Sequence, residues 1–207
     1  MQKPDNSQID QSSGQILHPG SRKLFRYWEA LRAERPCPER SEINLRNIAD
    51  IMPNLVILEK NPTKNLWIYR LAGSELCDLM QANQTGQDGL FGWDNFERDI
   101  ISKSWAISQD RKQPCLVRMR FCFDQLETQA AEQILLPVYD AKSNQVQLFG
   151  GVFVFPNQTH VAAAKFIRRE LISARMIWTE HQAGDALMNQ IGQKAAPLLR
   201  VIQGGLV

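Results

Sequence analysis

The chain has 207 residues, a hydrophobic fraction of 43%, a charged fraction of 22% and a formal net charge of +2. These values are typical of globular proteins, and they exclude a wholly disordered chain and a strongly basic nucleic-acid-binding protein. No apolar run reaches the roughly 18 to 20 residues of a transmembrane helix, and no signal-peptide pattern is present, so we expect a cytoplasmic protein.

The N-terminal region divides into a polar arm and a helix. Residues 1–20 are rich in Gln, Ser, Asn and Asp, and we expect them to be disordered. From Ser21, the expected cap, a helix is predicted as far as Arg35, with Phe25 and Trp28 on one apolar face. A face this aromatic predicts packing against a sheet or a second subunit.

A short helix and a hairpin follow. Residues Asn44–Met52 carry apolar side chains at helical spacing. The apolar runs Leu55–Leu58 and Leu66–Leu71 flank a polar segment with turn-forming residues, which predicts a β-hairpin.

The middle of the chain is predicted to be helical with a glycine-rich interruption. Ser74–Gln81 has a helical pattern, and residues 82–92 contain several glycines and should form loops. A longer helix is expected after Asp94, ending near Asp110.

Three further strands are predicted. In the first of them Val117, Met119, Phe121 and Phe123 alternate with Arg118 and Arg120, so one face should be buried and the other wet. The next two span about Thr128–Tyr139 and Val146–Phe155. Their short links require antiparallel pairing.

The last region changes in composition after Pro156. Its apolar residues favour a helix over His160–Glu180, with basic residues at Lys165, Arg168, Arg169 and Arg175. The segment from Gln182 onward should be weakly ordered. We therefore expect an arm (1–20), one domain (21–156) and a C-terminal helix with a tail (157–207).

This order of elements resembles the PAS fold. Three segments, Tyr27–Arg32, Pro38–Ile43 and Tyr69–Cys77, are similar to free-standing, mostly alphaproteobacterial PAS-domain proteins of unknown function. The resemblance implies an α+β fold, in which a five-stranded antiparallel sheet has helices over one face and flanking helices at both ends. It also implies a sensory or regulatory protein, and a homodimer with Phe25 and Trp28 in its interface.

In such a fold the strand-to-helix junction at Tyr69–Cys77 forms one wall of a small pocket. Apolar pockets with a few polar groups bind small ligands. The candidate lining residues are Trp67, Tyr69, Arg70, Cys77, Trp93, Trp105, Met119 and Phe121. As alternatives, the aromatic residues form a plain core, Cys77 is a packed thiol, and Arg70 forms an ion pair with Glu75 or Asp88.

No cofactor or metal is expected. The sequence around Cys77 lacks the pattern of flavin-binding PAS domains, and the helix Trp93–Asp110 has no histidine that could ligate haem. The chain has four cysteines, without Cys-x-x-Cys spacing, and three histidines, too few ligands for a closed zinc site. The cysteines should be reduced thiols.

No catalytic motif is present, so we expect a regulator rather than an enzyme. It would bind a small molecule or a partner protein, but not nucleic acid, and would signal through its flanking helices, with His160–Glu180 as a candidate output element. One alternative is a ligand-free interaction adaptor. The other is a membrane-surface or nucleic-acid accessory protein acting through the basic helix 160–180.

Overall fold

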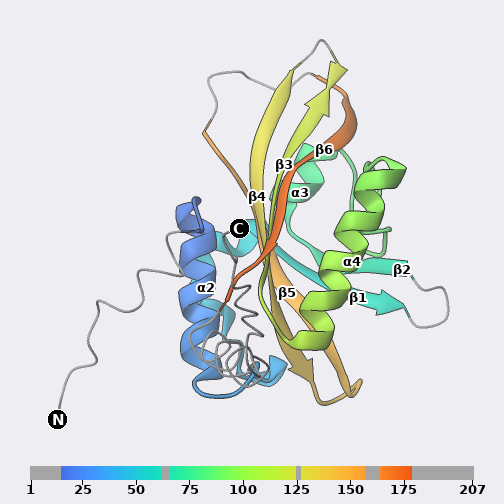
Figure 1. The fold of residues 1–207 in the computed structure, drawn as a ribbon. Helices are drawn as coiled ribbons and strands as arrows, with labels where there is room; N and C mark the ends of the chain where they lie inside the picture. Colours follow the sequence, from blue (N-terminus) through green and yellow to red (C-terminus); the bar gives the residue numbers. More distant parts are fainter. Residues whose placement is uncertain (1–14, 62–65, 125–126, 157–163, 179–207) are drawn as a thin grey trace, which may run out of the picture. The chain divides into compact units, whose positions relative to one another are not determined.

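Six strands form one curled antiparallel sheet in the order β2-β1-β5-β4-β3-β6 (Figure 1). The computed structural model describes residues 15–61, 66–124, 127–156 and 164–178. The elements are α2 (Pro19–Arg32), the 3-10 helices η1 (Arg40–Glu42) and η2 (Leu45–Asn54), β1 (Leu55–Asn61), β2 (Leu66–Ala72), α3 (Ser74–Leu79), α4 (Asn95–Arg111), β3 (Cys115–Phe123), β4 (Thr128–Asp140), β5 (Gln145–Val154) and β6 (Phe166–Met176). The chain divides into two compact units, residues 1–177 and residues 178–207. All these elements lie in the first unit. None of the helices in the described ranges is long and apolar enough to cross a membrane.

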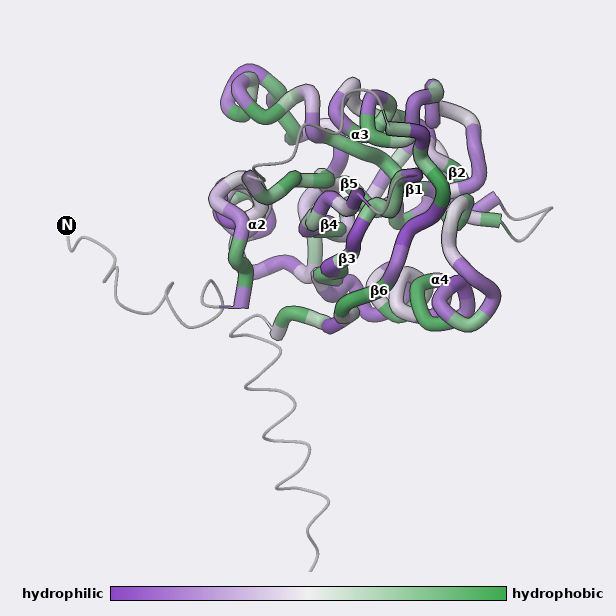
Figure 2. The backbone as a smooth tube through the Cα atoms, turned by 90° about the horizontal axis from the view of Figure 1, so that it is seen from above, coloured by the Kyte–Doolittle hydropathy of each residue, from purple (hydrophilic) through white to green (hydrophobic). Residues whose placement is uncertain are grey.

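The two faces of the sheet bury two separate apolar clusters. On β3, Val117, Met119 and Phe121 belong to the inner cluster with α3 and α4, whereas Leu116 belongs to the outer cluster with α2 and η2. This is the period of two predicted for the strand. In Figure 2 helix α2 and helix α4 lie on opposite sides of the strands.

Helix α2 begins earlier than predicted. Its N-cap is His18, whose Nδ1 accepts a hydrogen bond from the Gly20 N–H at 3.0 Å. Ser21, the expected cap, is buried within the helix. Residues 15–20 are not part of a disordered arm, because Ile16 is fully buried and the buried Glu132 carboxylate accepts the backbone N–H groups of residues 17 and 18. The rest of the expected arm lies outside the described residues.

The aromatic face of α2 packs on the outer side of the sheet of its own chain. Phe25 is 3% exposed and Trp28 is 1% exposed. The indole N–H of Trp28 donates to the Pro137 carbonyl on β4 at 2.7 Å. The predicted packing against a sheet is confirmed. The assignment of Phe25 and Trp28 to a subunit interface is wrong, because the sheet already buries both side chains.

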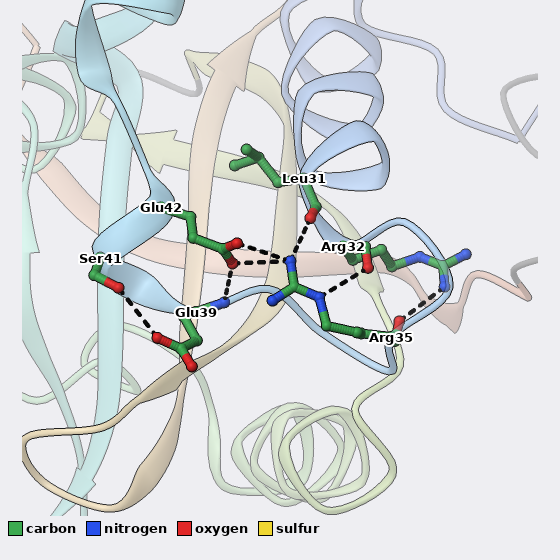
Figure 3. A network of polar contacts seen from close by, with 6 residues as sticks. All are labelled: Leu31, Arg32, Arg35, Glu39, Ser41 and Glu42. Atoms are coloured by element: carbon green, nitrogen blue, oxygen red, sulfur yellow. Dashed lines mark hydrogen bonds and ion pairs between the residues drawn. The ribbon is translucent and has the colours of Figure 1, made fainter.

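A polar network joins the end of α2 to η1 (Figure 3). Arg35 donates to the Leu31 carbonyl at 2.7 Å and to both carboxylate oxygens of Glu42 at 2.9 Å. The same carboxylate accepts the backbone N–H of Glu39 at 2.7 Å. Two of the segments that carried the family resemblance are therefore neighbours in space.

The predicted C-terminal helix is instead the sixth strand, β6 (orange in Figure 1). It pairs with β3 from Phe123↔Phe166 to Cys115↔Met176, with register shifts near its start and its middle. The inward-facing residues are Phe166, Arg169, Leu171, Ala174 and Met176. Because the two irregularities space these residues by three, two, three and two, the strand imitates a helical period.

The sixth strand corrects three predictions. The sheet has six strands rather than five, and the domain extends beyond residue 156. The basic helix 160–180 does not form over the described residues 164–178, so the membrane-surface or nucleic-acid alternative loses its structural basis. The expected weakly ordered tail from Gln182 lies outside the described residues.

The remaining elements agree with the sequence patterns. Strands β1 and β2 form the predicted hairpin, and β3, β4 and β5 are antiparallel neighbours. Helix α4 is capped by Asp94, whose Oδ1 accepts the Glu97 N–H at 2.8 Å. The short helix after Asn44 is a 3-10 helix.

Candidate functional site

Six of the eight predicted pocket residues meet in the inner cluster. They are Trp67 and Tyr69 on β2, Trp93 before α4, Trp105 on α4, and Met119 and Phe121 on β3. None is more than 6% exposed. The rings of Trp67 and Trp105 meet edge to face with centroids 5.7 Å apart. These six side chains, which we call the aromatic wall, come from three elements and one loop and belong to one cluster.

Arg70 lies on the other side of the sheet. Its guanidinium is 3.5 Å from the Glu59 carboxylate, and both line a surface hollow of about 550 Å³. Its ion-pair partner is thus Glu59 and neither Glu75 nor Asp88. Asp88 pairs with Arg98 at 2.7 Å. The prediction that Arg70 lines the aromatic pocket is wrong. Strand alternation is the reason, since the neighbouring Tyr69 faces inward.

Cys77 is also outside the aromatic cluster. It is half-buried on α3, and its thiol lies 3.8 Å from the Ala72 carbonyl oxygen. Leu76 is the α3 side chain that is fully buried in the inner cluster. Cys77 lines a shallow surface pocket with Ser74 and Gln81 instead. All four cysteines are free thiols.

The structure adds a buried glutamine that the sequence analysis did not select. Gln133 on β4 is fully buried, and neither of its side-chain amide atoms has a hydrogen-bond partner. Its neighbours at two residues' distance, Ala131 and Leu135, belong to the inner cluster. Gln133 therefore faces the same interior. The signal in the sequence was an amide side chain at a strand position whose neighbours two residues away, Ala131 and Leu135, are apolar.

Arg169 on β6 is the second addition. It is 1% exposed, and its Nη2 donates to the carbonyls of Gly89, at 2.8 Å, and Phe91. Its Nη1 is 3.4 Å from the Tyr69 hydroxyl, and its guanidinium carbon lies 4.7 Å from the Trp93 ring centroid. Burial lowers the pKa of Arg169 from its ordinary value. The sequence pattern instead predicts Arg169 as one of the basic residues of a C-terminal helix.

Several interior polar atoms have no partner. The indole N–H groups of Trp67, Trp93 and Trp105 are buried and unpaired, as are the Gln133 amide and Nε of Arg169. We call these five side chains the buried polar set. Buried polar groups in folded proteins are nearly always hydrogen-bonded to protein, water or ligand. The set presents mainly donors, with one acceptor at Gln133.

Residues 84–94 form a closing loop over this interior. At one end, the N–H groups of Gly86 and Gly89 donate to the carbonyls of Tyr69 and Trp67, each at 2.7 Å, along the outer edge of β2. At the other end, the Gly92 carbonyl accepts the Arg169 N–H at 2.7 Å. The loop therefore reaches from one edge strand of the sheet to the other.

Gly89 allows the loop to lie close to the cluster. A Cβ atom at this position would lie 2.7 Å from the Leu58 side chain and 3.1 Å from the Trp105 ring. Such contacts are shorter than packed carbon atoms permit. A larger residue would push the loop away from the aromatic wall.

Comparison with known proteins agrees with this architecture. The family model described as PAS domain matches residues 16–153, so the chain belongs to the PAS-domain family. PAS domains are sensory and regulatory modules, and this general class of function is the one that the family defines. No curated protein matches the chain. A solved structure described as "Flavin Analogue Sheds Light on Light-Oxygen-Voltage Domain Mechanism" aligns with 14% identity over 72% of this chain and 95% of that chain, with a TM-score of 0.41.

Proposed function

We propose that this protein is a regulatory PAS protein that binds a small molecule among the aromatic side chains of the inner cluster, beneath the closing loop. The observation that supports this most is the buried polar set, whose unpaired groups lie in or beside the largely apolar inner cluster. Leaving a buried polar group unpaired costs about 1 to 3 kcal/mol. A ligand with acceptor groups would recover part of that cost.

The function we propose is binding without catalysis. Cys115 is the thiol of the inner cluster, and burial raises its pKa to about 12, so it remains protonated and is a poor nucleophile. The described histidine, His18, lies at the start of α2 beside Phe153 of the outer cluster. We therefore propose a ligand other than haem, and the position of Cys77 outside the cluster supports a ligand other than flavin.

The signal would leave through the closing loop and β6. Arg169 contacts the loop through its side chain, and the backbone N–H of Leu171 donates to the Glu97 carboxylate at the start of α4, at 2.7 Å. A ligand that moves the loop must therefore change the edge strand that precedes the C-terminal residues. The output element that we propose is therefore the strand β6 and not the helix predicted from the sequence.

Native mass spectrometry of freshly purified protein tests the proposal. We expect a measured mass that exceeds the chain mass by that of one small molecule. Denaturation should release this molecule and leave the chain mass alone. The variant Gln133→Leu should lose the adduct because it removes a buried amide whose unpaired Nε2 donor could pair with a ligand acceptor. The matched control Gln145→Leu changes an exposed glutamine at the start of β5 and should retain it.

A second candidate function is a ligand-free interaction adaptor. An apolar groove of about 220 Å³ on the outer face favours it, because Leu45, Met52 and Leu71 in its lining are 40 to 46% exposed. A wild-type protein without any adduct, whose melting temperature is raised by no compound of a metabolite library, would contradict the ligand-binding proposal and support the adaptor.

A further inference from the structure

Arg169 carries a positive charge that the described part of the chain does not neutralise. It forms no ion pair there, although it is almost completely buried. A buried charge is costly unless it is paired, and removing a charge from water costs several kcal/mol per ion in real proteins. Two carbonyl groups and the face of Trp93 surround the guanidinium, but none of them supplies a negative charge.

The nearby acidic groups have other partners. Asp88 pairs with Arg98 at 2.7 Å, and its second oxygen accepts the Leu90 N–H at 2.9 Å. Glu97 accepts the Leu171 N–H through Oε1, and its Oε2 is buried without a partner but lies outside ion-pair distance of Arg169. Within the described ranges, the guanidinium therefore has no carboxylate partner.

Unpaired donors lie on and beside the Arg169 guanidinium. Its Nε has no acceptor, and its Nη1 has one long contact, to the Tyr69 hydroxyl. The unpaired indole N–H of Trp93 belongs to the ring that covers the guanidinium. A carboxylate has two acceptor oxygens and pairs well with a planar guanidinium, while the surrounding aromatic rings suit an apolar body.

We propose that the ligand of this protein is a carboxylate on an apolar, ring-sized body, with Arg169 as its counter-ion. This inference rests on the proposed function and names the chemical class of its ligand. Because Arg169 also holds the Gly89 and Phe91 carbonyls, a carboxylate that pairs with Arg169 competes directly with the closing loop. Ligand charge and loop position are then coupled through one side chain.

Benzoate and its neutral isostere benzamide test the role of charge. Full-length protein, stripped of any bound molecule by dialysis after mild denaturation and refolding, is titrated with each probe at constant ionic strength. Melting temperature and tryptophan fluorescence are the measurements. We expect benzoate to bind about 10- to 100-fold more tightly than benzamide, the ratio that a charge-assisted hydrogen bond supplies.

Two arginine variants locate the charge. Arg169→Met keeps a long apolar side chain and should abolish the preference for benzoate over benzamide. Arg168→Met is the matched control, because Arg168 is the adjacent β6 residue with a side chain 47% exposed. It should bind both probes like the wild type. A cooperative melting transition of the unliganded variant shows that Arg169→Met is folded.

The outcomes separate this inference from the proposed function. Equal binding of benzoate and benzamide to the wild type, or tight benzoate binding to Arg169→Met, would overturn the carboxylate and leave the small-molecule proposal intact. A neutral compound recovered by native mass spectrometry would do the same. Absence of any recovered compound together with no response to either probe would overturn both.

Discussion

At the scale of single residues, two polar side chains of the inner face are expected to lower the stability of the fold. Gln133 and Arg169 occupy positions where an apolar side chain would complete the cluster. Both retain unpaired polar atoms. A side chain that lowers the free energy of unfolding without completing its hydrogen bonds is expected at a functional site, where stability is exchanged for activity.

Replacing Gln133 by leucine should therefore stabilise the ligand-free protein. The change removes one buried amide group without hydrogen-bond partners, and leaving such a group unpaired costs about 1 to 3 kcal/mol. We expect a rise of about 1 to 3 kcal/mol in the free energy of unfolding, measured by urea denaturation. The exposed control Gln145→Leu should change it by less than about 0.5 kcal/mol. A destabilised Gln133→Leu protein would show that the amide has partners in solution.

His18 should make the stability dependent on pH. Burial lowers its pKa, against the opposing effect of Glu132. The folded state thus binds a proton at His18 less tightly than the unfolded state, so stability falls as the pH drops below about 6.5, the ordinary histidine value. The variant His18→Asn keeps an N-cap acceptor without a titrating group.

Thermal unfolding of both proteins between pH 5 and pH 8 measures this effect. The decrease in melting temperature towards pH 5 should be smaller in His18→Asn than in the wild type. Parallel curves for the two proteins would contradict a role for His18.

At the scale of elements, the closing loop and β6 act as one unit. Hydrogen bonds join them. The Arg169 backbone N–H donates to the Gly92 carbonyl, and the Arg169 side chain donates to the Gly89 carbonyl. The loop is also hydrogen-bonded to β2 at the opposite edge of the sheet. Loosening one end of such a loop raises the frequency of local opening along its length.

Hydrogen exchange should detect this coupling. In Arg169→Met, the Gly86 and Gly89 amides, which donate to β2, should exchange about 10- to 100-fold faster, because the side-chain hydrogen bonds to the loop are lost. Amides within α2 and all amides of the Arg168→Met control should keep their wild-type rates. Unchanged exchange at Gly86 and Gly89 would mean that each end of the loop is held independently.

At the scale of the whole molecule, the expected homodimer needs a surface other than Phe25 and Trp28. The apolar groove beside η2 is such a surface, since Leu45, Met52 and Leu71 are exposed there. Isolated exposed apolar side chains are common, and it is their grouping in one groove that leads us to predict the interface here. The homodimer remains a prediction.

Light scattering coupled to size exclusion tests it. We expect the wild type to elute at twice the chain mass and Met52→Asp to shift towards the monomer, because a buried carboxylate is costly in an apolar contact. The control Ile107→Asp places the same charge at an exposed position on α4. A monomeric wild type, or a Met52→Asp protein of unchanged mass, would contradict the prediction.

Local sequence patterns were sufficient for most elements. The hairpin of β1 and β2, the alternation of β3 and the capped helix α4 depend on residues close in sequence, so their periods and caps are visible in the chain itself. The same alternation that placed Tyr69 inward required Arg70 to face outward, although the sequence analysis assigned both to the pocket. The family resemblance supplied the fold class.

The sequence by itself determined the order of strands β1 to β5 along the chain, six members of the inner cluster and the resemblance to a regulatory family. Only the tertiary structure decided that residues 166–176 form a strand, because their two register shifts imitate a helix and the free edge of β3 is remote in sequence. It also decided which polar groups remain unpaired. Whether Gln133 or Arg169 has a partner depends on atoms brought together by folding from β2, β4, β6 and the closing loop, and no local pattern encodes that.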